Sequence, residues 1–340
     1  MSSRLGGQEI CCQKSCRSVG YDDPALGDFY ELMFMDSKRK ARSGLTIFFA
    51  VLVTGSAYFE HKILVLGGSI QNHLEIIFAL VWWVTVASIV SRLVMRESPR
   101  DVSFRWGGSA GTRAIAVATA MPLMVGFAGY GIAWGTGLAN FRAPDVSRIV
   151  LGIHFSLAVN PIVRLGQSVL ILLVFGALDD FKYAAGEEIG WRGYMLTRLV
   201  DSGVRAPILL SGLVWGLWHA PLIMSGQYAS GRYPLLSVCL FIVGILAAGY
   251  VFGWLRLSSG SIWPCIWAHG AWNAVIQGAF DRSVSGPSVW VGESGALTSA
   301  MLILFAVVLY RVWPLAQRTS LSTPPNWAAE LHGNIQTRQR

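Results

Sequence analysis

Long apolar runs alternate with short polar segments along most of the chain. Eight such runs, most of which approach the ~20 residues that a helix needs to cross a bilayer, lie near 44–59, 74–95, 114–137, 165–178, 206–224, 235–255, 262–280 and 296–313. The fourth run is short, which leaves seven spans as an alternative. Lipid cannot satisfy open backbone groups, and the runs lack the alternation of a β-barrel. The sequence therefore predicts an all-α, polytopic transmembrane helical bundle with about eight spans.

Composition strengthens this prediction and excludes one class of partner. Hydrophobic residues make up 53% of the 340 and charged residues only 14%, against about 25% charged in soluble domains. The formal net charge of +8 could suggest a nucleic-acid partner. However, the basic residues lie in short clusters between the apolar runs, as the positive-inside rule predicts. We therefore expect the lipid bilayer, and no nucleic acid, as the partner of this chain.

The basic clusters also predict an orientation in the cell membrane. The clusters expected in the cytoplasm precede the first run, follow the second and follow the fourth. They contain Lys38, Arg39, Lys40 and Arg42; Arg92, Arg96, Arg100, Arg105 and Arg113; and Lys182, Arg192, Arg198 and Arg205. An even number of spans then puts both termini of this multi-pass protein in the cytoplasm. We expect a polar N-terminal tail (1–43), N-terminal transmembrane helices (44–164), a transmembrane core (165–318) and a disordered C-terminal tail (319–340).

Two adjacent carboxylates follow the fourth run, in the segment 186–194 (GEEIGWRGY). On a helix, Glu188 and Arg192 are four residues apart on one face and can form an ion pair. Glu187 then points about 100° away, where it could face a cavity. The alternative is an interfacial loop whose charges are solvated.

Two histidines lie inside later runs. A helix that starts near Pro207 would carry His219 roughly 18 Å along its axis, where a single histidine could simply pack. His269 and Asn273 are four residues apart on one face, where alone they could just bond a neighbouring helix. Together with the carboxylates, they supply a general base, proton carriers and oxyanion donors. Ionisable residues inside a membrane are functional candidates by default.

The order of these motifs resembles the family of CAAX-prenyl-protease and bacteriocin-processing proteins (CPBP, or Abi), and its bacterial branch in particular. The resemblance covers roughly residues 165–280 and rests on EExxxR, aromatic-xxx-His and HxxxN motifs. The matching residues are Glu187, Glu188 and Arg192; Trp215 and His219; and His269 and Asn273. Trp215 stands where many members have Phe, a conservative change in a packing role.

The resemblance implies an intramembrane endopeptidase that hydrolyses a peptide bond of a membrane-associated peptide or protein near the membrane surface. In such a protease Glu187 would activate the attacking water, and His219 would hold that water or shuttle its proton. The HxxxN residues would stabilise the oxyanion. Glu188 and Arg192 would orient the first carboxylate.

The involvement of a metal is left open by the sequence. Glu187, His219 and His269 suffice in principle for a zinc site with water in the fourth position, and the family has been labelled as metalloproteases for this reason. It is also described as glutamate proteases that act without metal. The chain has no HExxH motif, and Asn273 is a natural second oxyanion donor. We therefore expect no cofactor, with zinc as the alternative.

Two other functions use the same residues. In a proton-coupled transporter, Glu187, His219 and His269 would form a relay. However, the sequence lacks the paired broken helices in repeated halves that are typical of many transporters. A non-catalytic membrane scaffold is the other alternative, but every residue of the three motifs is present.

Overall fold

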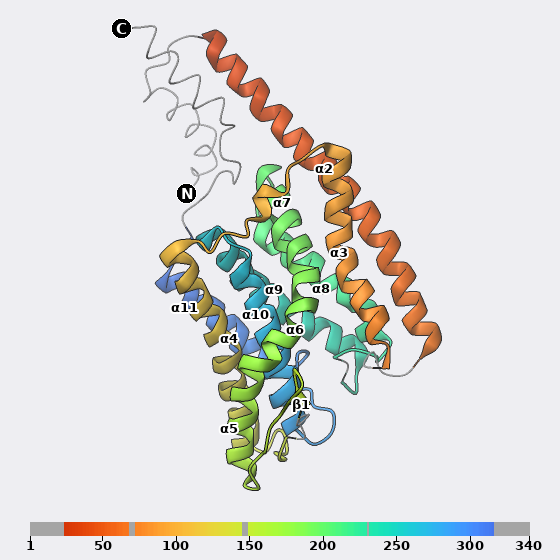
Figure 1. The fold of residues 1–340 in the computed structure, drawn as a ribbon, viewed down its shortest axis with the longest axis vertical. Coiled ribbons are helices and arrows are strands. Elements are labelled where there is room, and N and C mark those ends of the chain that lie inside the picture. The colour runs from red at the N-terminus through yellow and green to blue at the C-terminus, as the bar shows by residue number, and fades with distance from the viewer. Residues whose placement is uncertain (1–23, 68–71, 145–148, 230, 316–340) are drawn as a thin grey trace, which may run out of the picture.

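The computed structural model describes residues 24–67, 72–144, 149–229 and 231–315. Apart from one hairpin whose two strands have two residues each, the elements in these ranges are helical (Figure 1). They include 3-10 turns at η2 and η6 and π-helical turns at η3, η4 and η5. In chain order they are α2 (Pro24–Leu66), α3 (Leu74–Met95), η2 (Pro99–Val102), α4 (Gly108–Gly135), β1 (Ile149–Val150), β2 (Ile153–His154), α5 (Pro161–Ile171), η3 (Leu172–Gly176), α6 (Ala177–Gly190), η4 (Trp191–Met195), α7 (Leu196–Asp201), α8 (Pro207–Met224), α9 (Pro234–Ser259), α10 (Trp263–Trp272), η5 (Asn273–Phe280), η6 (Asp281–Ser283) and α11 (Ala296–Val312).

The predicted all-α membrane bundle is confirmed. A helix covers each of the eight apolar runs. Six helices of the described ranges are long and apolar enough to cross a membrane, and the fourth is a 41-residue unit, Pro161–Asp201. The remaining two runs form shorter helical segments, α10 with η5 and α11. The chain is a multi-pass helical membrane protein.

The fourth predicted span differs most from its expectation. The side chain of Asn160 accepts hydrogen bonds from the backbone N–H groups of Ile162 and Val163 and so starts the helix. The helix then continues far beyond residue 178. The prediction of a loop around Arg192 and Arg198 is therefore wrong, because both residues are buried in this helix. Carboxylates that lie nearby in the fold pair with Arg198, namely Glu97, Asp101 and Asp201. Buried charges persist where such partners exist.

The chain ends also bear on the predicted boundaries. Helix α2 begins at Pro24, inside the segment predicted as a polar tail, and extends beyond the rest of the bundle (Figure 1). The segment 24–43 is rich in Leu, Met, Lys, Arg and Ala, and such residues favour helix even where they are polar. The predicted disordered tail 319–340 lies outside the described residues.

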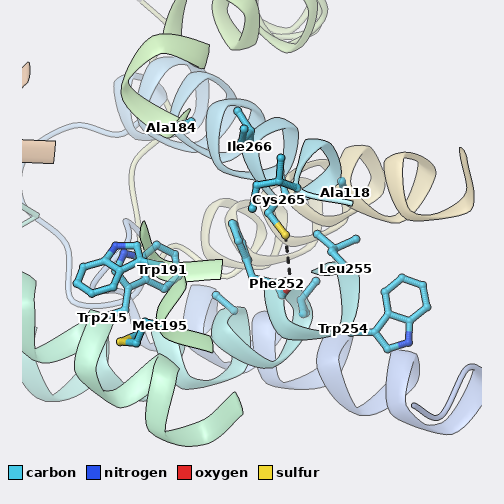
Figure 2. Close-up of a cluster of buried hydrophobic side chains, with 14 of the residues drawn as sticks. Ala118, Ala184, Trp191, Met195, Trp215, Phe252, Trp254, Leu255, Cys265 and Ile266 are labelled. Atoms are coloured by element: carbon cyan, nitrogen blue, oxygen red, sulfur yellow. Dashed lines mark hydrogen bonds between the residues drawn. The ribbon is translucent and has the colours of Figure 1, made fainter. Parts of the chain in front are cut away.

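The helices pack around one large apolar core. Helix α3 contacts α2 and α6, α10 contacts α4 and α6, and α9 contacts α8 and α11. Figure 2 shows this core, in which Trp191 and Trp215 lie close together. Two glycines allow close helix approach: a Cβ on Gly190 would lie 2.5 Å from the carbonyl oxygen of Val84, and one on Gly270 would lie 2.8 Å from that of Ala177. Small residues at helix contacts are typical of membrane bundles.

Candidate active site

The first motif lies in the buried half of α6 and in the π-helical turn η4 that follows it. Glu188 and Arg192 are 0% and 1% exposed, and Nη1 of Arg192 donates to Oε1 of Glu188 at 2.8 Å. The predicted ion pair is therefore present, and the alternative of a solvated loop is wrong. The guanidinium also lies 4.1 Å from the ring centroid of Trp215. A buried pair with such contacts fixes the conformation of this helix.

Glu187 points away from that pair. Its Oε2 atom accepts hydrogen bonds from two indole groups, Nε1 of Trp191 at 3.1 Å and Nε1 of Trp215 at 2.9 Å. Its other oxygen, Oε1, lies 3.9 Å from Nε2 of His269, which is too far for a direct hydrogen bond. One carboxylate oxygen is thus held, while the other faces the histidine across a gap.

His269 joins the first motif to the third. Its Nδ1 atom lies 2.9 Å from Oε1 of Glu188, and the ring is buried. Because an ionised carboxylate only accepts hydrogen bonds, Nδ1 is the donor. The Nε2 atom is therefore the one directed toward Glu187.

His219 is held differently. Its Nδ1 atom lies 2.9 Å from the backbone carbonyl oxygen of Trp215, so Nδ1 carries the proton and the neutral ring keeps its lone pair on Nε2. The ring stacks on Tyr228 with centroids 5.5 Å apart and meets the edge of Trp218 at 4.8 Å. These contacts fix the plane of the imidazole.

Asn273 is the first residue of the π-helical turn η5. Its Nδ2 atom donates to Oδ2 of Asp180 at 2.8 Å, and its Oδ1 atom accepts from Nε2 of Gln277 at 3.2 Å. The amide therefore sits between an acceptor and a donor, and Nδ2 retains one further N–H.

One cavity of about 470 Å³ is lined by Glu187, His219, His269 and Asn273 together. The four side chains come from α6, α8, α10 and η5, and they are the four that the sequence named as candidates. The lining of this cavity also has an apolar part. This apolar wall comes from α3 and α8, with residues that include Leu74, Ile77, Leu80, Val81 and Leu222. An activated nucleophile and hydrogen-bond donors can therefore act on one bond of a partly apolar ligand.

Comparison with known proteins matches the same part of the chain. Residues 162–275 match the family described as type II CAAX prenyl endopeptidase Rce1-like. CAAX prenyl protease 2 of Methanococcus maripaludis is 37% identical over 118 residues, covering 27% of this chain and 43% of that protein. The matched stretch contains all three motifs of the site, so this part of the chain is similar to the CPBP family. Protoheme IX farnesyltransferase of a Roseiflexus species is 25% identical over 113 residues, which cover 33% of this chain and 19% of that protein. The chain thus spans less than half the length of either relative.

Three residues beside the motifs were missed by the sequence analysis. Trp191 and Asp180 are within the matched region, whereas Glu293 lies outside it, in the loop before α11. Glu293 accepts hydrogen bonds from Tyr228 at 2.5 Å and from Trp272 at 2.7 Å. Asp180 could have been found, because a residue seven positions before Glu187 shares its helical face. Nothing in the sequence connects Glu293 to this site.

Trp215 has a larger role than the packing that the sequence suggested. Its indole N–H donates to Glu187, as described above. A phenylalanine, the residue that many family members have here, has no such donor. The change from Phe to Trp therefore adds a hydrogen bond to the candidate base.

The zinc alternative concerns Glu187, His219 and His269. In the described part of the chain, no three His, Cys, Asp or Glu side chains are grouped so that they could hold one metal ion. His219 and His269 each use Nδ1 for a contact with a carbonyl or carboxylate oxygen, as metal-bound histidines do, and each keeps Nε2 as a possible ligand. The chemistry below is therefore derived from the side chains alone.

Proposed function

We propose that this protein is an intramembrane endopeptidase that hydrolyses a peptide bond near the membrane surface. The observation that carries the proposal is the convergence of Glu187, His219, His269 and Asn273 on one cavity. These groups come from helices spread over 87 positions of the sequence. Hydrolysis requires a base, an oxyanion site and a proton carrier within a few ångströms of one carbonyl.

In this proposal Glu187 is the general base. The indole donors of Trp191 and Trp215 hold Oε2, and Oε1 takes a proton from the attacking water as the water oxygen bonds to the scissile carbonyl carbon. The protonated carboxyl then gives this proton to the departing amine nitrogen as the C–N bond breaks. Water is consumed, and the products are a carboxylic acid and an amine.

The negative charge that develops on the carbonyl oxygen is stabilised by His269 and Asn273. The charges of Glu188 and Arg192 neutralise each other. The negative charge of Glu187 is therefore balanced when His269 is positively charged, with a proton on both nitrogens. The Nε2–H of His269 and the second N–H of Asn273 then donate to the oxyanion. Because His269 is buried, its bond to the oxyanion contributes more than it would at the surface.

His219 is assigned to the attacking water. Its Nδ1 proton is committed to the carbonyl group of Trp215, so Nε2 can accept a hydrogen bond from that water and orient it. The stacking on Tyr228 keeps the ring in this plane. This role agrees with the tautomer that the contact selects in the neutral ring, with the proton on Nδ1.

The similarity and the lining of the cavity support one class of substrate. One relative is named a CAAX prenyl protease, and the cavity has an apolar wall beside the polar groups. We propose a membrane-associated peptide or protein as the substrate, and C-terminal prenylated peptides as the first to test. We also propose cytoplasmic termini in the cell membrane, which the basic clusters before the first run and after the second favour.

The decisive experiment compares wild type with Glu187→Gln after purification in detergent and reconstitution in vesicles. Mass spectrometry of a peptide library that includes prenylated CAAX peptides measures cleavage. Wild type should cut, Glu187→Gln should not, and Glu75→Gln, the same change at an exposed site on α3, should behave as wild type. Cleavage by Glu187→Gln at the wild-type rate contradicts the proposed base. Proton flux across the vesicle membrane without any cleavage would favour the transporter instead.

A further inference from the structure

The Asn273 amide is oriented by two neighbours of opposite character. Asp180 accepts from its Nδ2 atom, and Gln277 donates to its Oδ1 atom. A flipped amide would place Oδ1 against the carboxylate of Asp180 and Nδ2 against the amide nitrogen of Gln277. Both contacts would then be repulsive, because a carboxylate only accepts and an NH₂ group only donates. The observed orientation is therefore fixed.

The position of Asp180 suits this task. It lies on α6, seven residues before Glu187 and therefore on the same face of that helix. Asp180 and Asn273 both line the cavity, although they are 93 residues apart in the sequence. Their hydrogen bond thus ties the helix that carries the candidate base to the turn that carries a candidate oxyanion donor.

We propose that Asp180 is a positioning residue that holds the Asn273 amide nitrogen toward the cavity. One N–H of Nδ2 bonds to Asp180, and this bond aims the second N–H at the carbonyl oxygen of the substrate. The inference rests on the proposed peptidase function and deepens it. Asp180 itself touches neither substrate nor water in this scheme, and its effect on the reaction passes entirely through Asn273.

The test is a double-mutant cycle of Asp180→Leu and Asn273→Ala, with kcat and KM measured separately. Asp180→Leu should lower kcat and leave KM nearly unchanged, because the lost interaction is made in the transition state. The loss should not exceed the roughly 100- to 1,000-fold that removing one oxyanion donor costs. In the Asn273→Ala background the same change should have no further effect. An equal further loss there overturns the proposal.

Two matched variants separate positioning from general structural damage. Asp180→Asn keeps an acceptor oxygen in nearly the same place and should retain kcat within several-fold of wild type. Asp179→Leu makes the same change at the adjacent exposed residue, which pairs with Lys182, and should have no effect. If Asp180→Asn is as inactive as Glu187→Gln, the carboxyl group of Asp180 is needed to transfer a proton. That result overturns the proposal. Should Asp180→Leu not fold, Asp180→Ala takes its place in the cycle.

A spectroscopic readout keeps this inference separate from the peptidase proposal. Selective ¹⁵N-asparagine labelling reports the side-chain amide of Asn273, which is assigned by its loss in Asn273→Ala. Asp180→Leu should shift that signal and speed its hydrogen exchange, whereas Asp179→Leu should not. An unchanged signal overturns the positioning role whether or not cleavage occurs. If wild type cleaves, Glu187→Gln does not and Asp180→Leu keeps the wild-type kcat, the peptidase proposal stands. That result overturns only the positioning role of Asp180.

Discussion

Oε1 of Glu188 lies 2.9 Å from Nδ1 of His269, and the same oxygen accepts a hydrogen bond from Arg192. The second carboxylate of the first motif therefore joins two motifs that are 81 residues apart. It holds the histidine from behind while the opposite ring nitrogen points at Glu187. The two adjacent glutamates thus occupy different positions in one site, with one facing the cavity and the other supporting it.

Arg192→Ala should lower stability as well as activity. The substitution leaves the fully buried Glu188 without its cationic partner, and breaking a buried pair costs about 3–5 kcal/mol. Thermal unfolding in detergent should show a large fall in Tm. Lys182→Ala is the matched control, because its pair with Asp179 is about half exposed and such pairs contribute little. A Tm equal to wild type for Arg192→Ala would contradict the structural role of the pair.

Trp215→Phe should lower kcat without unfolding the protein. The aromatic ring still packs against Phe252 and Arg192, but Glu187 loses one of two indole donors. A hydrogen bond to a charged group contributes about 1.5–3 kcal/mol. Because Trp191 still donates to Glu187, we expect kcat to fall by roughly 10-fold when the bond from Trp215 is lost. Trp254→Phe is a suitable control, because that indole donates to the Trp313 carbonyl group, away from the site. If Trp215→Phe and wild type have the same kcat, the role of Trp215 is packing alone.

Cleavage should survive exhaustive chelation. The described residues offer no group of three ligands that could hold a metal ion, and a zinc site would require Glu187, His219 and His269 to converge within about 2 Å of one point. Activity is measured after dialysis against chelator, with elemental analysis of the same sample. Activity that is lost to chelator and restored by zinc, together with stoichiometric zinc in the untreated protein, would establish the metalloprotease mechanism.

The stability of the protein should depend on Asp281 between about pH 4 and pH 7. Burial, together with the charge of Glu293, raises the pKa of Asp281 from 3.8 to about 7, despite a hydrogen bond from Tyr130 that lowers it. Because the folded pKa exceeds the unfolded one, the stabilisation is complete below pH 3.8 and is lost as the pH rises to 7. Asp281→Asn, which stays neutral, should therefore lose less Tm than wild type between pH 5 and pH 8. Parallel Tm curves for the two proteins would contradict this pKa.

The sequence by itself determined the features that depend on local spacing or on composition. Apolar runs of sufficient length predicted the membrane helices, since lipid cannot satisfy open backbone groups. The pairing of Glu188 with Arg192 was predictable because residues four apart meet on any helix. Three of the four cavity candidates were found because ionisable groups in or beside apolar runs are conspicuous, and Asn273 was found because it lies one helical turn from His269. Their roles in catalysis stay predictions until activity is measured.

The tertiary structure alone decided which groups meet across the bundle. A run of charged residues after residue 178 resembled a loop in the sequence, whereas partners from distant segments, such as Glu97 and Asp101 for Arg198, keep it helical and buried. The indole donors to Glu187, the contact of Asp180 with Asn273, and Glu293 beside Tyr228 depend likewise on helix packing. Periodicity fixes the face on which a side chain lies, but only the packing of separate helices fixes what that face meets.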